Sequence, residues 1–207
     1  MTSSLAKKMQ PKEKFTTIKP EDIVNLLNKN FFNLMSIFYE TQSVYLSGMY
    51  KKLGSIETAT ILECFVQNMH LTIIRQRERN LNYDVSLKSF WKNLQAISKP
   101  SEKISSIVQT TSIPKETVRR KINNLLSAEL LLTKKNAKGY YWNITPKEQD
   151  IFYNDIEKEI IILAQFTYVF AKNLNLNLSL KSIINEIKMQ FSFYWYHFLT
   201  CQLLWLK

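Results

Sequence analysis

Apolar residues recur three or four positions apart along most of the chain, which is the spacing of one face of an amphipathic helix. Capping residues and prolines indicate where these helical patterns start and stop. The pattern predicts a series of helices: one opening at Glu21 and Asp22 with Gly48 and Gly54 near its end, one capped by Ser55 and ending in the charged stretch 75–80, a short one over 86–97, one from Glu148 to Lys172, and a last one from Ser179 or Ser182 to Trp205.

The end of the last predicted helix has an unusual composition. Residues 189–206 contain no Asp, Glu, Lys or Arg but seven aromatic side chains, so this helix must be buried on most sides. Three interpretations are open: a subunit interface, which we favour because aromatic residues concentrate in interface cores, a helix buried within the monomer, and a membrane-spanning tail. The polar residues within it make it a poor lipid-facing segment: Gln190, Ser192, His197, Thr200 and Gln202.

A different pattern occupies residues 98–147. A short helix from Lys103 to Thr110, capped by Ser101, leads through a tight polar connection to a second helix of about 114–126, with Pro114 in its first turn. At about 100° per residue, one side of this second helix is aliphatic: Val118, Ile122, Leu125 and Leu126. The opposite side is polar, with two cations at its shoulders: Glu116, Thr117, Arg120, Asn123 and Asn124, flanked by Arg119 and Lys121.

Two strand-like runs follow the second helix, within residues 130–145. They are joined by a turn that contains Asn136 and Gly139, which is typical of a β-hairpin. The tip of the predicted hairpin is basic, because it carries Lys134, Lys135 and Lys138. Two helices followed by a hairpin are the elements of a winged helix-turn-helix.

The second helix of a helix-turn-helix enters the major groove of DNA. Arginine can bind guanine through O6 and N7, and asparagine can bind adenine through N6 and N7, while flanking cations suit phosphates. We therefore expect three groups of DNA contacts: base edges at Thr117, Arg120, Asn123 and Asn124, phosphates at Lys115, Arg119 and Lys121, and the minor groove or backbone at Lys134, Lys135 and Lys138.

The charge of the chain is concentrated in this same stretch. The formal net charge is +11, and residues 99–147 contribute ten basic and three acidic residues to it. A local positive field of this kind attracts polyanions and speeds their capture. The charge distribution therefore favours double-stranded DNA as the partner.

The stretch resembles a known class of DNA-binding module. The run from Ile113 to Ile122, the leucines that follow it and the lysine-tipped hairpin look like bacterial winged helix-turn-helix transcription regulators, over residues 98–145 only. The step Thr117-Val118-Arg119 is similar to that of GntR-type recognition helices, and the helices on both sides of the wing are similar in arrangement to MarR-like dimers. The resemblance implies that Arg119 contacts DNA and that Thr117 contacts phosphate. Glu129 departs from the pattern, since such proteins often carry glycine there.

The whole chain is expected to be mainly α-helical, because three glycines and five prolines in 207 residues leave few turns for a strand-rich fold. We expect a flexible basic arm over 1–20, a helical segment over 21–97, the DNA-binding domain over 98–147 and a C-terminal helical segment over 148–207 that forms the homodimer. The two helical segments are expected to join into one bundle. The start of the chain lacks a secretion signal, which predicts a cytoplasmic protein.

The sequence gives no pattern for an enzyme, a cofactor or a metal. Cys64 and Cys201 lie far apart and are expected to be small buried side chains. His70 and His197 have no acidic or cysteine partner at a useful spacing, so each is expected to be hydrogen-bonded or exposed. The tyrosines and phenylalanines of 31–50 and 152–170 could line an effector pocket, but core packing is the preferred interpretation.

One alternative function is kept open. The winged helix could be an adaptor that binds protein, with the aromatic C-terminal helix docking on a partner or a membrane. Salt separates the two functions, because phosphate contacts on DNA release counterions and an adaptor contact does not.

Overall fold

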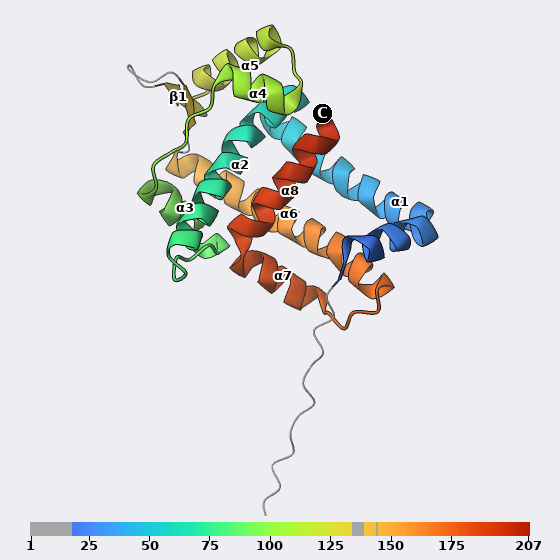
Figure 1. Ribbon diagram of the computed structural model, residues 1–207. Coiled ribbons are helices and arrows are strands. Elements are labelled where there is room, and N and C mark those ends of the chain that lie inside the picture. The colour runs from blue at the N-terminus through green and yellow to red at the C-terminus, as the bar shows by residue number, and fades with distance from the viewer. Residues whose placement is uncertain (1–17, 134–138, 144) are drawn as a thin grey trace, which may run out of the picture.

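The computed structural model describes residues 18–133, 139–143 and 145–207 and confirms a mainly helical protein with one small sheet (Figure 1). The described elements are, in chain order, α1 (Pro20–Leu53), α2 (Ile56–Arg79), α3 (Leu87–Ala96), α4 (Ile104–Thr111), α5 (Lys115–Ser127), β1 (Leu131–Thr133), β2 (Tyr140–Trp142), α6 (Pro146–Asn173), α7 (Leu180–Met189) and α8 (Phe191–Leu206).

The predicted starts and stops of the first helices are confirmed. Gly54 ends α1 in the left-handed conformation, with a φ of 68°, which glycine adopts without a steric penalty. Ser55 then caps α2 by accepting a hydrogen bond from the backbone of Thr58. Ser86 caps α3 in the same way. The sequence therefore places these boundaries by local chemistry alone.

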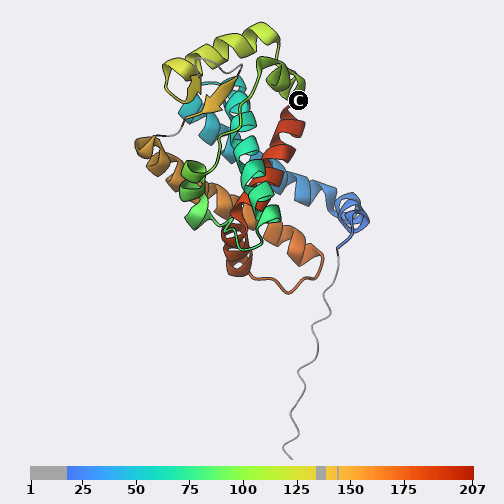
Figure 2. The same ribbon diagram turned by 60° about the vertical axis from the view of Figure 1, so that its left-hand side comes forward.

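Helix α2 lies at the centre of the molecule. It packs along α8, and it also contacts α1, α4 and α5. The two helices α2 and α8 lie side by side in both ribbon views (Figure 2). One hydrophobic core includes side chains from all three expected segments, 21–97, 98–147 and 148–207, with Phe65, Phe90 and Phe191 as its largest fully buried side chains.

The prediction of one last helix from Ser179 or Ser182 to Trp205 is wrong, because the chain forms two helices there, α7 and α8. The backbone leaves the helical conformation at Gln190, and the amide of Ser192 donates to the carbonyl of Val85 at 3.1 Å. The break lets α7 pack on α6 while α8 packs on α2. Periodicity could not show it, since residues 189–206 are apolar on nearly every side.

Helix α8 buries one face within the chain. Phe191, Trp195, Leu199 and Leu203 follow one another at four-residue spacing, and each is at most 3% exposed. Phe193, Leu204 and Trp205 lie on the exposed side. The monomer itself therefore accounts for the buried face of this aromatic helix.

The small sheet is an antiparallel pair in which Leu131 lies opposite Trp142 and Thr133 opposite Tyr140. The sequence did not predict its extension, a bridge between Glu102 and Tyr140 with two backbone hydrogen bonds of 2.9 Å. Because of this bridge, Lys103 and not Ser101 occupies the N-cap of α4. Gly139 permits the close approach, since a Cβ atom there would lie 2.9 Å from Cβ of Ser101.

Candidate nucleic-acid interface

Helices α4 and α5 are joined by a short turn that is fixed by local hydrogen bonds. Ser112 ends α4 in the left-handed conformation, with a φ of 59°. The hydroxyl of Thr111 accepts a hydrogen bond from the backbone of Ile113 at 3.2 Å, and Pro114 is the N-cap of α5. These contacts set the angle at which α5 leaves α4.

The predicted aliphatic stripe of α5 is confirmed. Val118, Ile122 and Leu125 are at most 2% exposed and belong to the main core, and Leu126 is half-buried against it. This stripe packs α5 on α2 and α4. The side of α5 that carries the stripe is therefore fixed, and the opposite side must face solvent.

The solvent-facing side of α5 carries the expected base-reading residues. Arg120, Asn123 and Asn124 are exposed, and their side chains make no hydrogen bond to another described residue. Thr117 is half-buried at the edge of this face. We call Arg120, Asn123 and Asn124 the α5 face. Its guanidinium and two amides are free to contact a partner.

The two cations at the shoulders of α5 differ from each other. Arg119 is exposed and pairs with Glu116 at 2.7 Å, and an exposed pair of this kind contributes little to stability. Lys121 turns toward the start of α2 instead, where its ammonium donates to Ser55 Oγ at 2.7 Å and lies 3.8 Å from Glu57. Its side chain is only 16% exposed. The structure therefore places Arg119 beside the α5 face and Lys121 against α2.

Glu57 belongs to the same contact on α2. The hydrogen bond from Ser55 and the nearby charges of Lys121 and Arg120 lower the pKa of this carboxyl group from its ordinary value. Its negative charge keeps Lys121 in place. Lys121 is thus a link between α2 and α5 rather than a free cation.

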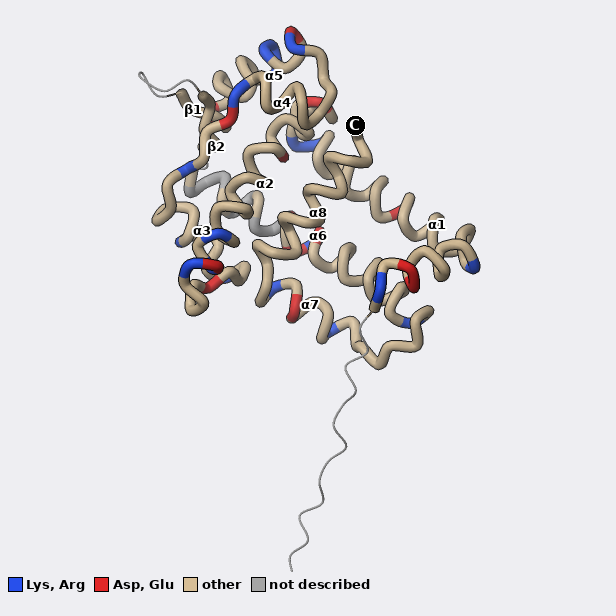
Figure 3. Tube along the Cα trace, viewed as in Figure 1, with Lys and Arg blue, Asp and Glu red and all other residues tan. Residues whose placement is uncertain are grey.

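A cleft of about 480 Å³ opens between α4, α5 and the hairpin. Three cations line it, Lys103 from the N-cap of α4 and Lys115 and Arg119 from α5, while Gly139 and Tyr140 line its hairpin side. The N-cap residue makes no side-chain hydrogen bond to the first turn of α4, so the amides of that turn also favour an anion. We call this the cationic cleft. Figure 3 shows basic residues of α5 on this end of the molecule.

Lys103 could not be assigned to the cleft from the sequence pattern. Lys103 precedes Lys115 by twelve residues, and only the bridge between Glu102 and Tyr140 brings it to the hairpin. The expected wing contacts Lys134, Lys135 and Lys138 lie outside the described residues. The described part of the hairpin comprises the two strands and Gly139.

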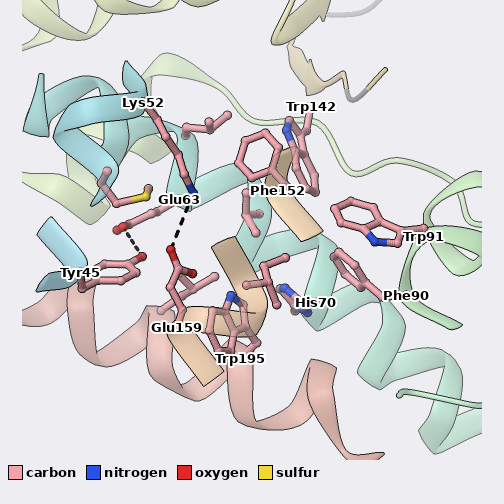
Figure 4. Close-up of a pocket in the computed structure, with 15 residues that line it drawn as sticks. Tyr45, Lys52, Glu63, His70, Phe90, Trp91, Trp142, Phe152, Glu159 and Trp195 are labelled. Atoms are coloured by element: carbon pink, nitrogen blue, oxygen red, sulfur yellow. Dashed lines mark hydrogen bonds and ion pairs between the residues drawn. The ribbon is translucent and has the colours of Figure 1, made fainter. Parts of the chain in front are cut away.

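A second group of polar side chains lies at the meeting point of α1, α2 and α6, where Tyr45 and Glu63 are buried and Lys52 and Glu159 are half-buried (Figure 4). Tyr45 donates a hydrogen bond of 2.6 Å to Glu63, and Lys52 lies 3.8 Å from Glu159. Burial raises the pKa of Glu63 and that of Glu159 to about 7 each. These carboxyl groups therefore change charge near neutral pH.

The expectation for His70 is wrong. This side chain is fully buried, and neither ring nitrogen has a hydrogen-bond partner in the described structure. It stacks on Phe90, with the ring centroids 4.7 Å apart, and meets the edge of Phe191. Burial lowers the pKa of His70 to about 3, so it is a neutral aromatic side chain in the core. His197 is exposed, as expected.

The two cysteines also differ. Cys64 is buried, as expected, and burial raises the pKa of its thiol to about 12. Cys201 is exposed on α8, so the expectation of a buried side chain is wrong there. It lies on the side of α8 that faces α1 and α6 rather than α2.

Among the described residues, no three His, Cys, Asp or Glu side chains are grouped as metal ligands would be. In the same part of the chain, every helix is too short or too polar to cross a membrane. No protein-family model, curated protein or solved structure that was compared with the chain matches it.

Proposed function

We propose that this protein is a DNA-binding transcription regulator and that α4, α5 and the hairpin act as a winged helix-turn-helix. The observation that carries the proposal is the α5 face, exposed and without internal hydrogen bonds, directly beside the cationic cleft. The bridge between Glu102 and Tyr140 supports it, because a winged helix-turn-helix places a short strand before its two helices against the hairpin.

In the proposed complex, α5 lies in the major groove. Arg120 contacts guanine, and Asn123 and Asn124 contact adenine, through paired hydrogen bonds. Lys115 and Arg119 bind a backbone phosphate at the cationic cleft, which fixes the register of α5 on the duplex. Lys103 joins them in this role from the other side of the cleft.

The protein acts as a homodimer in this proposal, so that two copies of α5 reach successive major grooves about one helical turn apart. Large exposed apolar side chains on α1 and α8 offer surface that a second copy can cover. They include Phe32, which is 83% exposed, and Phe31, Tyr39, Phe193, Leu204 and Trp205. Sedimentation equilibrium of the full chain measures this state directly.

The decisive experiment is binding of the full-length protein to fragmented DNA from its source genome across a salt series. Phosphate contacts predict that the affinity falls steeply as salt rises. Replacing Arg119 and Arg120 together by alanine should lower the affinity for enriched fragments by about 10- to 1000-fold, since one phosphate contact and one base contact are lost.

A matched control removes the same two charges elsewhere. Lys29 belongs to the N-terminal part of α1 and Lys181 to α7, and both are exposed. Figure 1 shows the N-terminal part of α1 and all of α7 away from α5. Their double replacement by alanine should leave the enriched sites unchanged. Equal losses of affinity in both double variants would indicate that the DNA is attracted by net charge only. An affinity that is the same in both variants and at every salt concentration would favour the adaptor function.

A further inference from the structure

A large cavity lies between α1, α6, α7 and α8, in the part of the bundle away from α5. Its volume is about 650 Å³. Protein interiors pack as densely as organic crystals and leave few voids larger than a water molecule. A space of this size is within the range of small-molecule binding sites.

The walls of this cavity are mostly aromatic and aliphatic. Phe38 from α1 and Phe166 from α6 line it and contact each other, with ring centroids 6.2 Å apart. Ile183 and Ile187 of α7 line another side and are anchored in the main core. Such walls suit a flat apolar or aromatic body.

Two buried amides line the same cavity. Gln42 on α1 is 6% exposed and Gln202 on α8 is 2% exposed, and the Oε1 atom of each has no hydrogen-bond partner in the described structure. A buried polar atom that remains unpaired costs free energy, so a partner that donates a hydrogen bond there is favoured.

Ring contacts between α1 and α8 bring the two amides to one level. Phe38 contacts Trp205 with centroids 6.0 Å apart, and Tyr45 contacts Phe198 at 5.0 Å. Along α1, Gln42 lies between Phe38 and Tyr45. Along α8, Gln202 lies between Phe198 and Trp205. Both amides therefore line the cavity from corresponding levels of α1 and α8.

Among the described residues that line the cavity, Glu186 carries a carboxylate and His197 an imidazole, and both side chains are exposed to solvent. The closed side offers neutral amides and apolar walls, which disfavour a charged ligand because it would lose its hydration there.

We propose that this cavity binds a neutral, largely apolar small molecule that has an aromatic body and a hydrogen-bond donor placed against Gln42 and Gln202. This site is separate from the α5 face and does not depend on DNA binding.

N-phenyl-1-naphthylamine is a suitable probe, since it is neutral, has two aromatic parts joined by one N–H group, and fluoresces when it leaves water. We expect saturable binding of one probe per chain. The double replacement of Gln42 and Gln202 by leucine should weaken binding by about 2- to 10-fold, which corresponds to the loss of the one hydrogen bond that the N–H group can donate. Competition by 1-benzylnaphthalene, which has CH₂ in place of N–H, should be insensitive to both substitutions.

A pair of variants tests the location. Thr167 is exposed on α6 and lines the cavity, so Thr167→Trp should fill its mouth and abolish binding. Gln165 is exposed on the same helix and does not line the cavity, so Gln165→Trp should bind as the unmodified protein does. Unchanged binding by Thr167→Trp would overturn the proposal.

The unmodified protein provides a second test that needs no substitution. Cys201 lines the cavity and is exposed, whereas Cys64 is buried with a thiol whose pKa is raised to about 12. A disulfide reagent such as 5,5′-dithiobis(2-nitrobenzoic acid) should therefore react first at Cys201, and saturating probe should slow this reaction. No protection by the probe would contradict the site. Neither readout involves DNA, so the failure of this proposal and that of the proposed function are distinguishable.

Discussion

The α5 end and the cavity end of the molecule obtain their candidate functions in opposite ways. At the α5 end, a tightly packed aliphatic stripe of Val118, Ile122 and Leu125 holds a helix whose outer face is polar and exposed. At the cavity end, four helices with apolar faces leave a space between them. The first region holds polar side chains in solvent on a helix that the core fixes. The second region surrounds polar and apolar side chains with a space that its four helices do not fill.

The two candidate sites differ in the charge of their walls, and this difference favours different kinds of ligand. The cationic cleft is lined by Lys103, Lys115 and Arg119, which suits a polyanion that approaches from solvent. The cavity has uncharged amides at its closed side, which suits a ligand that leaves water. Helices α2 and α8 connect the two regions, and Lys207 at the end of α8 donates to the carbonyl of Gln109 on α4 at 3.2 Å.

The largest expected effect separates the two faces of α5. Ile122→Ala should lower the free energy of unfolding by about 2–5 kcal/mol, because it opens a cavity under a helix that the core holds. Asn123→Ala on the exposed side should change it by less than about 0.5 kcal/mol. Urea unfolding followed by circular dichroism measures both. A large loss for Asn123→Ala would mean that the α5 face is already engaged within the protein.

The core that joins the two regions should respond to pH. The pKa of Glu63 is about 7 in the folded chain against an ordinary value of 4.5, so the folded chain binds a proton across this window that the unfolded chain does not. Its contribution to the free energy of unfolding is therefore greatest below pH 4.5 and is lost as pH rises through 7. Glu159 acts in the same direction, while buried His70, whose pKa is about 3, opposes them between pH 3 and 6.5.

A single variant isolates the Glu63 contribution. Glu63→Gln keeps an oxygen that accepts the hydrogen bond from Tyr45 and removes the charge. Relative to this variant, the unmodified protein should gain about 1 kcal/mol when pH falls from 8 to 6, since His70 and Glu159 are common to both. Thermal unfolding at the two pH values gives the difference. A difference that is independent of pH would place the pKa of Glu63 near its ordinary value.

The hydroxyl of Ser55 has three partners: it accepts from the backbone of Thr58 at the start of α2 and from the ammonium of Lys121 on α5, and it donates to the carboxylate of Glu57. Ser55→Ala should therefore lower the free energy of unfolding by about 1 kcal/mol through loss of the cap. Ser55→Asn retains a capping oxygen and should recover most of that loss. If Ser55→Ala left stability unchanged, the cap would not contribute to the support of α5.

Local features of the fold could be predicted from the sequence, and features that need distant contacts could not. The caps at Ser55 and Ser86 and the stripe of α5 follow from residues within a few positions of one another. The break at Gln190 could not be predicted, because an all-round apolar segment has no periodicity to interrupt. The cationic cleft depends on the pairing of Glu102 with Tyr140, thirty-eight positions later.

The candidate sites show the same division. Arg120, Asn123 and Asn124 could be assigned to one face by angle alone, as the structure confirms. The same angles put Lys121 at a shoulder, but they cannot show that α2 places Ser55 and Glu57 beside it. The cavity that Gln42 and Gln202 line depends on how α1 and α8 are arranged in space. The pattern of residues along one helix carries no information on that arrangement.

The smallest expected effect distinguishes two lysines of α5 that look equivalent in the sequence. Lys115 is exposed and lines the cationic cleft, while Lys121 is held by α2. In the proposed complex, Lys115→Ala should weaken DNA binding to all sequences alike and reduce the slope of log affinity against log salt by about 1. Lys121→Ala should leave that slope unchanged and lower the stability of the free protein by no more than about 1 kcal/mol. Fluorescence anisotropy with one labelled duplex at several salt concentrations gives both slopes. The reverse result, with Lys121 changing the slope and Lys115 not, would move the phosphate contact from the cationic cleft to the α2 side of α5.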